Sequence, residues 1–166
     1  MFIFCAILSN PSRMKKIDIR SAALKDLPIL YEFEQGIITA ERPYDETLKP
    51  GHITYYDLEA MIKSDSTEVI VATIDQEIVG SAYIDIRKAK PYLKHVYYGH
   101  LGFMYVKPEY RGKGINKKII NELIIWARTK NINELRLDVY SGNKSAIRAY
   151  EKAGFTKHLI NMRIQV

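Results

Sequence analysis

The sequence predicts an α/β (α+β) fold, in which a mixed, mostly antiparallel central sheet of six to seven strands carries helices on both faces. Strand-like and helix-like patterns follow one another in the order β-α-α-β-β-β-α-β-α-β. A length of 166 residues, of which 47% are hydrophobic, suffices for one domain with a core but not for two. We therefore expect residues 1–13 to be an N-terminal extension and residues 14–166 to form a single domain.

The first half of the chain is predicted to hold one strand and two helices around a long loop. Residues 17–20 alternate apolar and polar side chains, which favours a strand. The helix that follows has Asp26 at its N-cap and Pro28 in its first turn, where a missing N–H costs nothing. Two prolines, a glycine and no periodicity predict a loop over residues 39–52, and a short helix follows over residues 55–63.

The second half is predicted to supply most of the sheet. Its elements, in order, are a hairpin of residues 69–74 and 78–86, a central strand at 98–106, a helix from 115, a strand at 135–140, a helix at 143–153 and one or two closing strands within 155–166.

The loop between the central strand and the next helix has the chemistry of a phosphate site. A helix that begins just after two glycines, Gly112 and Gly114, offers unpaired backbone N–H groups and the positive end of its dipole. The basic side chains around it are Arg111, Lys113, Lys117 and Lys118. The dinucleotide-binding pattern needs a glycine where Lys117 stands, and the nucleotide P-loop needs Ser or Thr where Gly114 stands. Taken alone, the same residues also fit a purely structural turn.

Two motifs in the right order resemble the GCN5-related N-acetyltransferase superfamily. Residues 111–116, Arg-Gly-Lys-Gly-Ile-Asn, resemble the loop Arg/Gln-x-x-Gly-x-Gly/Ala, although Asn116 stands where the family usually has Gly or Ala. Residues 143–155 are similar to Asn-x-x-Ala-x-x-x-Tyr-x-x-x-Gly-Phe. The similarity covers about residues 96–156, with a looser match of element order from residue 15.

The resemblance implies that the chain binds acetyl-CoA as a co-substrate. The pyrophosphate would lie on the loop of Arg111, Gly112, Lys113, Gly114, Ile115 and Asn116. The pantetheine arm would pair with backbone groups of Met104, Tyr105 and Val106. Asn143 would cap the helix that it precedes and also bond the pantetheine amides.

The resemblance also suggests the groups that move protons. Tyr150 stands where the family often has the tyrosine that protonates the leaving thiolate, and its alternative is an aromatic side chain packed in the helix. His100, expected on the same strand face as Met104, could be the base that accepts a proton from the amine. Ordered water in place of a base and a purely structural His100 are the alternatives that the sequence leaves open.

The predicted loop at residues 39–52 concentrates acidic side chains in an otherwise basic chain. They are Glu41, Asp45 and Glu46, and long loops in compact domains are commonly functional. In the resembled family this connection helps to form the acceptor site, so the acidic residues favour a cationic amine. A solvated surface loop is the alternative.

Composition limits the kinds of partner, metal site and membrane segment that the chain can have. A formal net charge of +6 favours polyanionic partners, and both coenzyme A and a nucleic acid fit that description. The single cysteine, Cys5, excludes an intramolecular disulfide and is compatible with a cytoplasmic protein. The four histidines show no metal-ligand spacing, so we expect no metal. The apolar run at residues 1–8 is too short to span a membrane.

The leading hypothesis is an acetyl-CoA-dependent N-acetyltransferase, in which a primary amine attacks the thioester directly in a ternary complex. Its acceptor would be a small-molecule or peptide amine. The sequence is compatible with a homodimer as well as with a monomer. A non-catalytic acyl-CoA-binding regulatory module is the alternative. A nucleic-acid-binding domain ranks last, because the basic residues gather at one loop and no recognition helix is evident.

Overall fold

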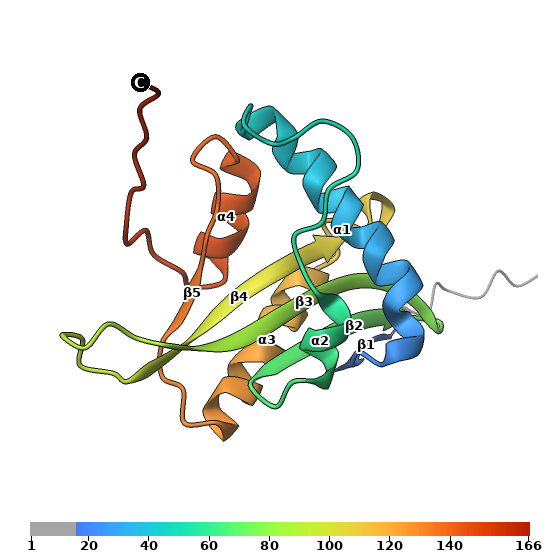
Figure 1. The fold of residues 1–166 in the computed structure, drawn as a ribbon. Helices are drawn as coiled ribbons and strands as arrows, with labels where there is room; N and C mark the ends of the chain where they lie inside the picture. The colour runs from blue at the N-terminus through green and yellow to red at the C-terminus, as the bar shows by residue number, and fades with distance from the viewer. Residues whose placement is uncertain (1–15) are drawn as a thin grey trace, which may run out of the picture.

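A five-stranded sheet forms the centre of the protein (Figure 1). The structure, a computed structural model, describes residues 16–166, so the expected extension at residues 1–13 lies outside the described residues. The strands lie in chain order across the sheet: β1 (Ile17–Ser21), β2 (Thr67–Ile74), β3 (Glu77–Lys88), β4 (Tyr97–Val106) and β5 (Leu135–Leu137). Neighbours are antiparallel except β4 and β5, which are parallel, so the expected mixed, mostly antiparallel sheet is confirmed.

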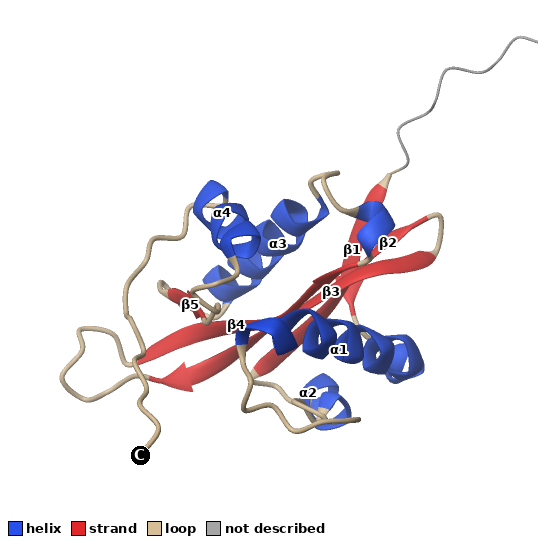
Figure 2. Cartoon of the chain, turned by 90° about the horizontal axis from the view of Figure 1, so that it is seen from above, coloured by secondary structure: helices blue, strands red, loops and turns tan. Residues whose placement is uncertain are grey.

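Helices cover both faces of this sheet. Those within residues 16–166 are α1 (Leu27–Glu41), α2 (Leu58–Lys63), α3 (Ile115–Thr129) and α4 (Lys144–Lys152). Figure 2 shows α1 and α2 on one side of the sheet and α3 and α4 on the other. Leu30 and Phe33 of α1 and Leu58 of α2 are buried against the first face, and Ile119 and Leu123 of α3 against the second. The predicted layers are therefore confirmed.

The hairpin of β2 and β3 forms as predicted. Its two turn residues, Asp75 and Gln76, have φ angles of +49° and +70°. Left-handed residues at both central positions give a two-residue turn whose twist matches that of the strands. Both strands are buried on both faces for most of their length, which explains their continuous apolar runs.

A bulge interrupts β4 at Phe103, which has a φ of +54°. Between the pairs Ser81–Tyr105 and Tyr83–Gly102, three steps along β4 match two steps along β3. Such an extra residue turns the rest of the strand over, so that the face of each later side chain changes.

The bulge corrects the predicted face of His100. Leu101 before the bulge and Met104 and Val106 after it all pack against the α3 side of the sheet. His100 precedes Leu101 and therefore points to the opposite side, that of α1 and α2. The expectation that His100 and Met104 share a face is wrong, because the sequence carries no local sign of the extra residue.

Strands β4 and β5 stay together for only three residue pairs. Gly99, His100 and Leu101 pair with Leu135, Arg136 and Leu137. Beyond Leu101, β4 continues to Val106, whereas β5 ends at Leu137. Within residues 16–166, the last part of β4 therefore has no neighbouring strand on the β5 side.

Residues 155–166 form no strand, so the expected six to seven strands are wrong for residues 16–166, which hold five. The segment alternates apolar and polar residues, but its apolar side chains are exposed: Leu159, Ile160, Met162, Ile164 and Val166. A strand is stable when a neighbour satisfies its backbone, and a local pattern does not specify that neighbour. Strand β5 is also shorter than the expected residues 135–140.

The first helix extends further than predicted. It ends at Glu41, so this residue belongs to α1 and the loop starts with a 3-10 turn over Arg42–Tyr44. Asp26 does stand at the N-cap of α1, but its carboxylate does not cap the helix. It pairs instead with Arg20 at 2.6 Å.

Candidate active site

The glycine-flanked loop lies between the end of β4 and the start of α3. Gly112 and Gly114 have φ angles of +74° and +78°, a left-handed conformation that glycine adopts without strain. A Cβ atom built on either glycine would meet no atom within 4 Å. The need for glycine here is therefore conformational, and the space above the backbone is open.

The first turn of α3 presents free donors to this space. No side chain caps the helix, and its first backbone hydrogen bond runs from Lys118 N–H to the Gly114 carbonyl at 3.2 Å. The N–H groups of residues 115–117 thus have no acceptor within the helix, and the helix dipole adds positive charge. The basic side chains exposed around it are Arg111, Lys113, Lys117 and Lys118. This donor set suits a pyrophosphate.

The end of β4 offers backbone groups next to the loop. Lys107 N–H donates to the Val79 carbonyl at 2.9 Å, which fixes the direction of the amides before it. Because this direction alternates along a strand, the backbone of Tyr105 faces β3, whereas Met104 and Val106 face the side from which β5 has diverged. Two of the three predicted backbone sites therefore lie on the open edge.

Two contacts fix the surroundings of that edge. Arg111 Nε donates to the Val106 carbonyl at 3.0 Å, which ties the basic loop to the strand. The ring of Tyr105 packs against Phe33 with centroids 4.7 Å apart. It also lies so close to Gly36 that a Cβ there would be 2.6 Å from the Tyr105 ring, so α1 needs glycine at this contact.

Two further residues of the predicted site, Asn143 and Tyr150, lie at the start and in the last turn of α4. Asn143 caps the helix, since its Oδ1 accepts hydrogen bonds from Ala146 N–H and Ser145 Oγ, both at 3.1 Å. The cap is confirmed, and the Asn143 amide nitrogen remains able to donate. Tyr150 lies in the last turn with its ring edge-on to Phe155, at a centroid distance of 6.1 Å.

The environment of Tyr150 keeps its hydroxyl protonated. Burial, followed by the negative charge of Glu41, raises the pKa of Tyr150 to about 12. A proton donor must hold its proton at neutral pH, and Tyr150 does so. The same environment makes it a weaker acid than free tyrosine by about 3 kcal/mol.

His100 lies where β4 and β5 still pair. Its side chain is 13% exposed, and its Nε2 atom is 3.9 Å from Asp138 Oδ2. Burial, and then the charge of Arg87, lowers the pKa of His100 below 6.5. The imidazole is therefore neutral at pH 7, which a proton acceptor requires.

The three acidic residues of the predicted acceptor loop have different surroundings. Glu41 is half-buried at the end of α1, and burial raises its pKa. The Asp45 side chain is only 14% exposed and is held by several donors, whereas Glu46 is exposed. The side chains of Glu41 and Asp45 are therefore partly buried, and that of Glu46 faces solvent.

A family comparison covers most of the chain. The sequence profile of the Acetyltransferase (GNAT) family matches residues 33–155. The chain belongs to the GNAT acetyltransferase family. The matched region runs from α1 to Phe155 and includes the glycine-flanked loop, the open edge of β4 and Tyr150.

Curated GNAT relatives match a shorter stretch. Thialysine N-epsilon-acetyltransferase of Bos taurus is 46% identical over 55 residues, which are 33% of this chain and 32% of that protein. The corresponding protein of Sus scrofa is 44% identical over the same length. The match therefore spans about a third of these relatives.

Solved structures share the GNAT fold over nearly the whole chain. A predicted acetyltransferase of Clostridium acetobutylicum, solved with acetyl-CoA, has a TM-score of 0.70 at 19% identity over 90% of this chain and 96% of that chain. An aminoglycoside N-acetyltransferase in complex with CoA has a TM-score of 0.67 at 19% identity, over 90% and 100% of the two chains. A tetramutant of a Bacillus halodurans protein has a TM-score of 0.81 at 19% identity, over 90% and 99%.

One buried acid of α1 was not predicted from the sequence. Glu34 of α1 is fully buried, and its Oε1 accepts hydrogen bonds from Tyr55 and Tyr56 N–H at 2.7 and 2.9 Å. Its other oxygen has no hydrogen-bond partner within residues 16–166. Glu34 fixes the segment before α2 against α1. The only signal in the sequence is a glutamate between the apolar residues Phe33 and Ile37 of one helix.

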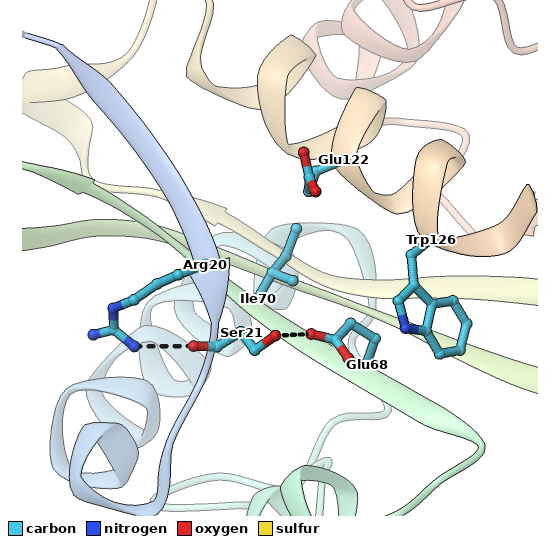
Figure 3. A pocket seen from close by; sticks show the side chains of 6 residues that line it. All are labelled: Arg20, Ser21, Glu68, Ile70, Glu122 and Trp126. Carbon is cyan, nitrogen blue, oxygen red and sulfur yellow. Dashed lines mark hydrogen bonds between the residues drawn. The ribbon is translucent and has the colours of Figure 1, made fainter. Parts of the chain in front are cut away.

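A separate cavity of about 140 Å³ lies between the β1 edge of the sheet and α3 (Figure 3). Its lining residues are Arg20, Ser21, Glu68, Ile70, Glu122 and Trp126. Ser21 Oγ donates to Glu68, and Arg20 bonds the backbone of Ser21, so the polar groups on the β1 side already have partners. No residue of the predicted GNAT site lines it.

The described residues hold neither a metal-binding cluster nor a membrane-spanning helix. Within residues 16–166, no group of three or more His, Cys, Asp or Glu side chains is placed to hold a metal ion. None of the helices described is long and apolar enough to cross a membrane.

Proposed function

We propose that this chain is an acetyl-CoA-dependent N-acetyltransferase that acetylates a cationic primary amine directly in a ternary complex. The proposal is supported by three features of the structure that lie next to one another. A left-handed glycine loop opens onto the uncapped start of α3, the free edge of β4 runs up to that loop, and Tyr150 and Glu41 lie on the neighbouring elements.

Different residues of this chain would bind different parts of acetyl-CoA. The α3 N–H groups and the basic side chains of the loop would hold the pyrophosphate of acetyl-CoA, which supplies the acetyl group as a thioester. Met104 and Val106 would bond the pantetheine amides through their backbones, and Asn143 through its side-chain amide. These contacts would fix the reacting groups in place, which lowers the entropic barrier to reaction.

Proton movement would rest on two side chains. Tyr150 is protonated at neutral pH and would donate to the sulfur that departs. His100 is neutral at pH 7 and would accept a proton from the amine, directly or through water.

The acceptor is proposed to be a cationic amine because Glu41, Asp45 and Glu46 gather at the end of α1 and in the loop after it. Amines of this class include thialysine, the compound in the names of the curated relatives, and the aminoglycosides acetylated by a structural neighbour. A cytoplasmic location, to which the single cysteine is suited, belongs to the same proposal.

The test is an amine panel with acetyl-CoA, in which released thiol is measured over time. Thialysine, lysine, spermidine and kanamycin represent cationic acceptors, and glucosamine 6-phosphate is the anionic comparison. We expect turnover with at least one cationic amine and a lower kcat/KM for the phosphate ester. Binding of coenzyme A by calorimetry without turnover of any amine would support a non-catalytic acyl-CoA-binding module instead.

A further inference from the structure

Three segments that are far apart in the sequence meet at the carboxylate of Asp45. Its Oδ1 accepts hydrogen bonds from Thr47 N–H at 3.0 Å, Thr47 Oγ1 at 2.6 Å and Arg163 Nη1 at 2.8 Å. Its Oδ2 accepts from the Tyr140 hydroxyl at 3.1 Å. Thr47 belongs to the loop after α1, Tyr140 to the segment between β5 and α4, and Arg163 to the C-terminal segment. The donors also hold the pKa of Asp45 well below its usual range.

Aromatic packing strengthens the same junction. The rings of Tyr44 and Tyr140 stack with centroids 6.2 Å apart and an interplanar angle of 25°. Gly142 lies against the Tyr44 ring, since a Cβ there would be 2.9 Å from it. Asn143, the cap of α4, follows directly, so the acceptor loop is fastened to the start of the helix that carries Tyr150.

We propose that Asp45 and Arg163 are positioning residues, which hold the acceptor loop and the C-terminal segment against the base of α4. This inference rests on the proposed function. An amine that bound Asp45 would have to displace Arg163 or Tyr140, because four donors already occupy its two oxygens. Glu41, half-buried at the end of α1, and the exposed Glu46 are then the acidic residues left to meet the amine.

A positioning role and a direct-ligand role for Asp45 predict opposite changes in the acceptor KM of one variant. If Arg163 positions the loop, Arg163→Gln should raise the acceptor KM by about ten-fold or lower kcat, because Asp45 loses the tie to the C-terminal segment. If Asp45 were a direct ligand, Arg163 would compete with the cationic substrate. Its removal would then lower the acceptor KM.

The experiment measures kcat and both KM values for the amine of the panel that releases thiol fastest. The matched control is Lys157→Gln, since Lys157 lies in the same segment and pairs with Glu151 at 3.1 Å, not with Asp45. We expect this control and the KM for acetyl-CoA to stay within about two-fold of wild type. Arg163→Lys should rescue the loss, because a single nitrogen of Arg163 contacts both Asp45 and Thr47, and an ammonium can take its place.

A double-mutant cycle measures whether Asp45 and Arg163 act through each other. Asp45→Asn should reduce acceptor kcat/KM at least as much as Arg163→Gln, and the double variant should be no worse than Asp45→Asn alone. Thermal melts establish that each variant is folded. A lower acceptor KM in Arg163→Gln, additive effects in the cycle, or wild-type kinetics in both single variants would overturn the inference while the acetyltransferase activity stands. Absence of turnover by the wild-type protein would overturn both proposals together.

Discussion

Valine at both Gly112 and Gly114 should weaken coenzyme A binding by about 30- to 700-fold. Both glycines have φ near +75°, and an L-residue in that conformation costs roughly 1–2 kcal/mol. A Cβ at either position meets no atom, so the cost comes from the backbone alone and sums to about 2–4 kcal/mol for two residues. Valine lets the free loop relax out of the left-handed conformation, so binding has to restore it and the cost appears in the affinity, at about ten-fold per 1.4 kcal/mol.

Calorimetric titration of coenzyme A into the folded double variant measures the effect. Gly51→Val is the matched control, because Gly51 has a φ of +77° and equally open space but lies in the loop between α1 and α2. It should lower the melting temperature without changing coenzyme A affinity. A Gly112→Val and Gly114→Val double variant that folds and binds within about three-fold of wild type would refute the assignment of the phosphate site.

Three further predictions concern the remaining site residues. Tyr150→Phe should lower kcat by about 10²- to 10⁴-fold, as the loss of a positioned acid does, and leave the affinity for acetyl-CoA nearly unchanged; wild-type turnover would make Tyr150 structural. Replacing Glu41 and Glu46 by Gln should raise the acceptor KM and not that of acetyl-CoA, with an effect that shrinks as salt rises. His100 accepts a proton only when neutral, so kcat/KM should fall as pH drops through its lowered pKa, and His100→Asn should remove that limb of the pH profile.

Much of the fold and the conformation of the glycine-flanked loop could be predicted because their signals are local. The hairpin turn at Asp75 and Gln76, the glycines before α3 and the Asn143 cap depend on a few neighbouring residues, and the structure has each of them. The order of strands and helices also follows from local periodicity. The residues of this loop and those at the start of α4 lie in the elements that the sequence predicted for them, and their binding roles stay predictions.

The remaining features were decided by tertiary structure. The bulge at Phe103 depends on how β4 pairs with β3, and it sets which later residues of β4 share a face with His100. Residues 155–166 have the pattern of a strand without a strand partner in the structure. Asp45 meets Tyr140 and Arg163 across 95 and 118 residues of sequence. A local pattern fixes backbone preference and the buried side of an element, whereas strand partners and long-range contacts are set by the packing of distant segments.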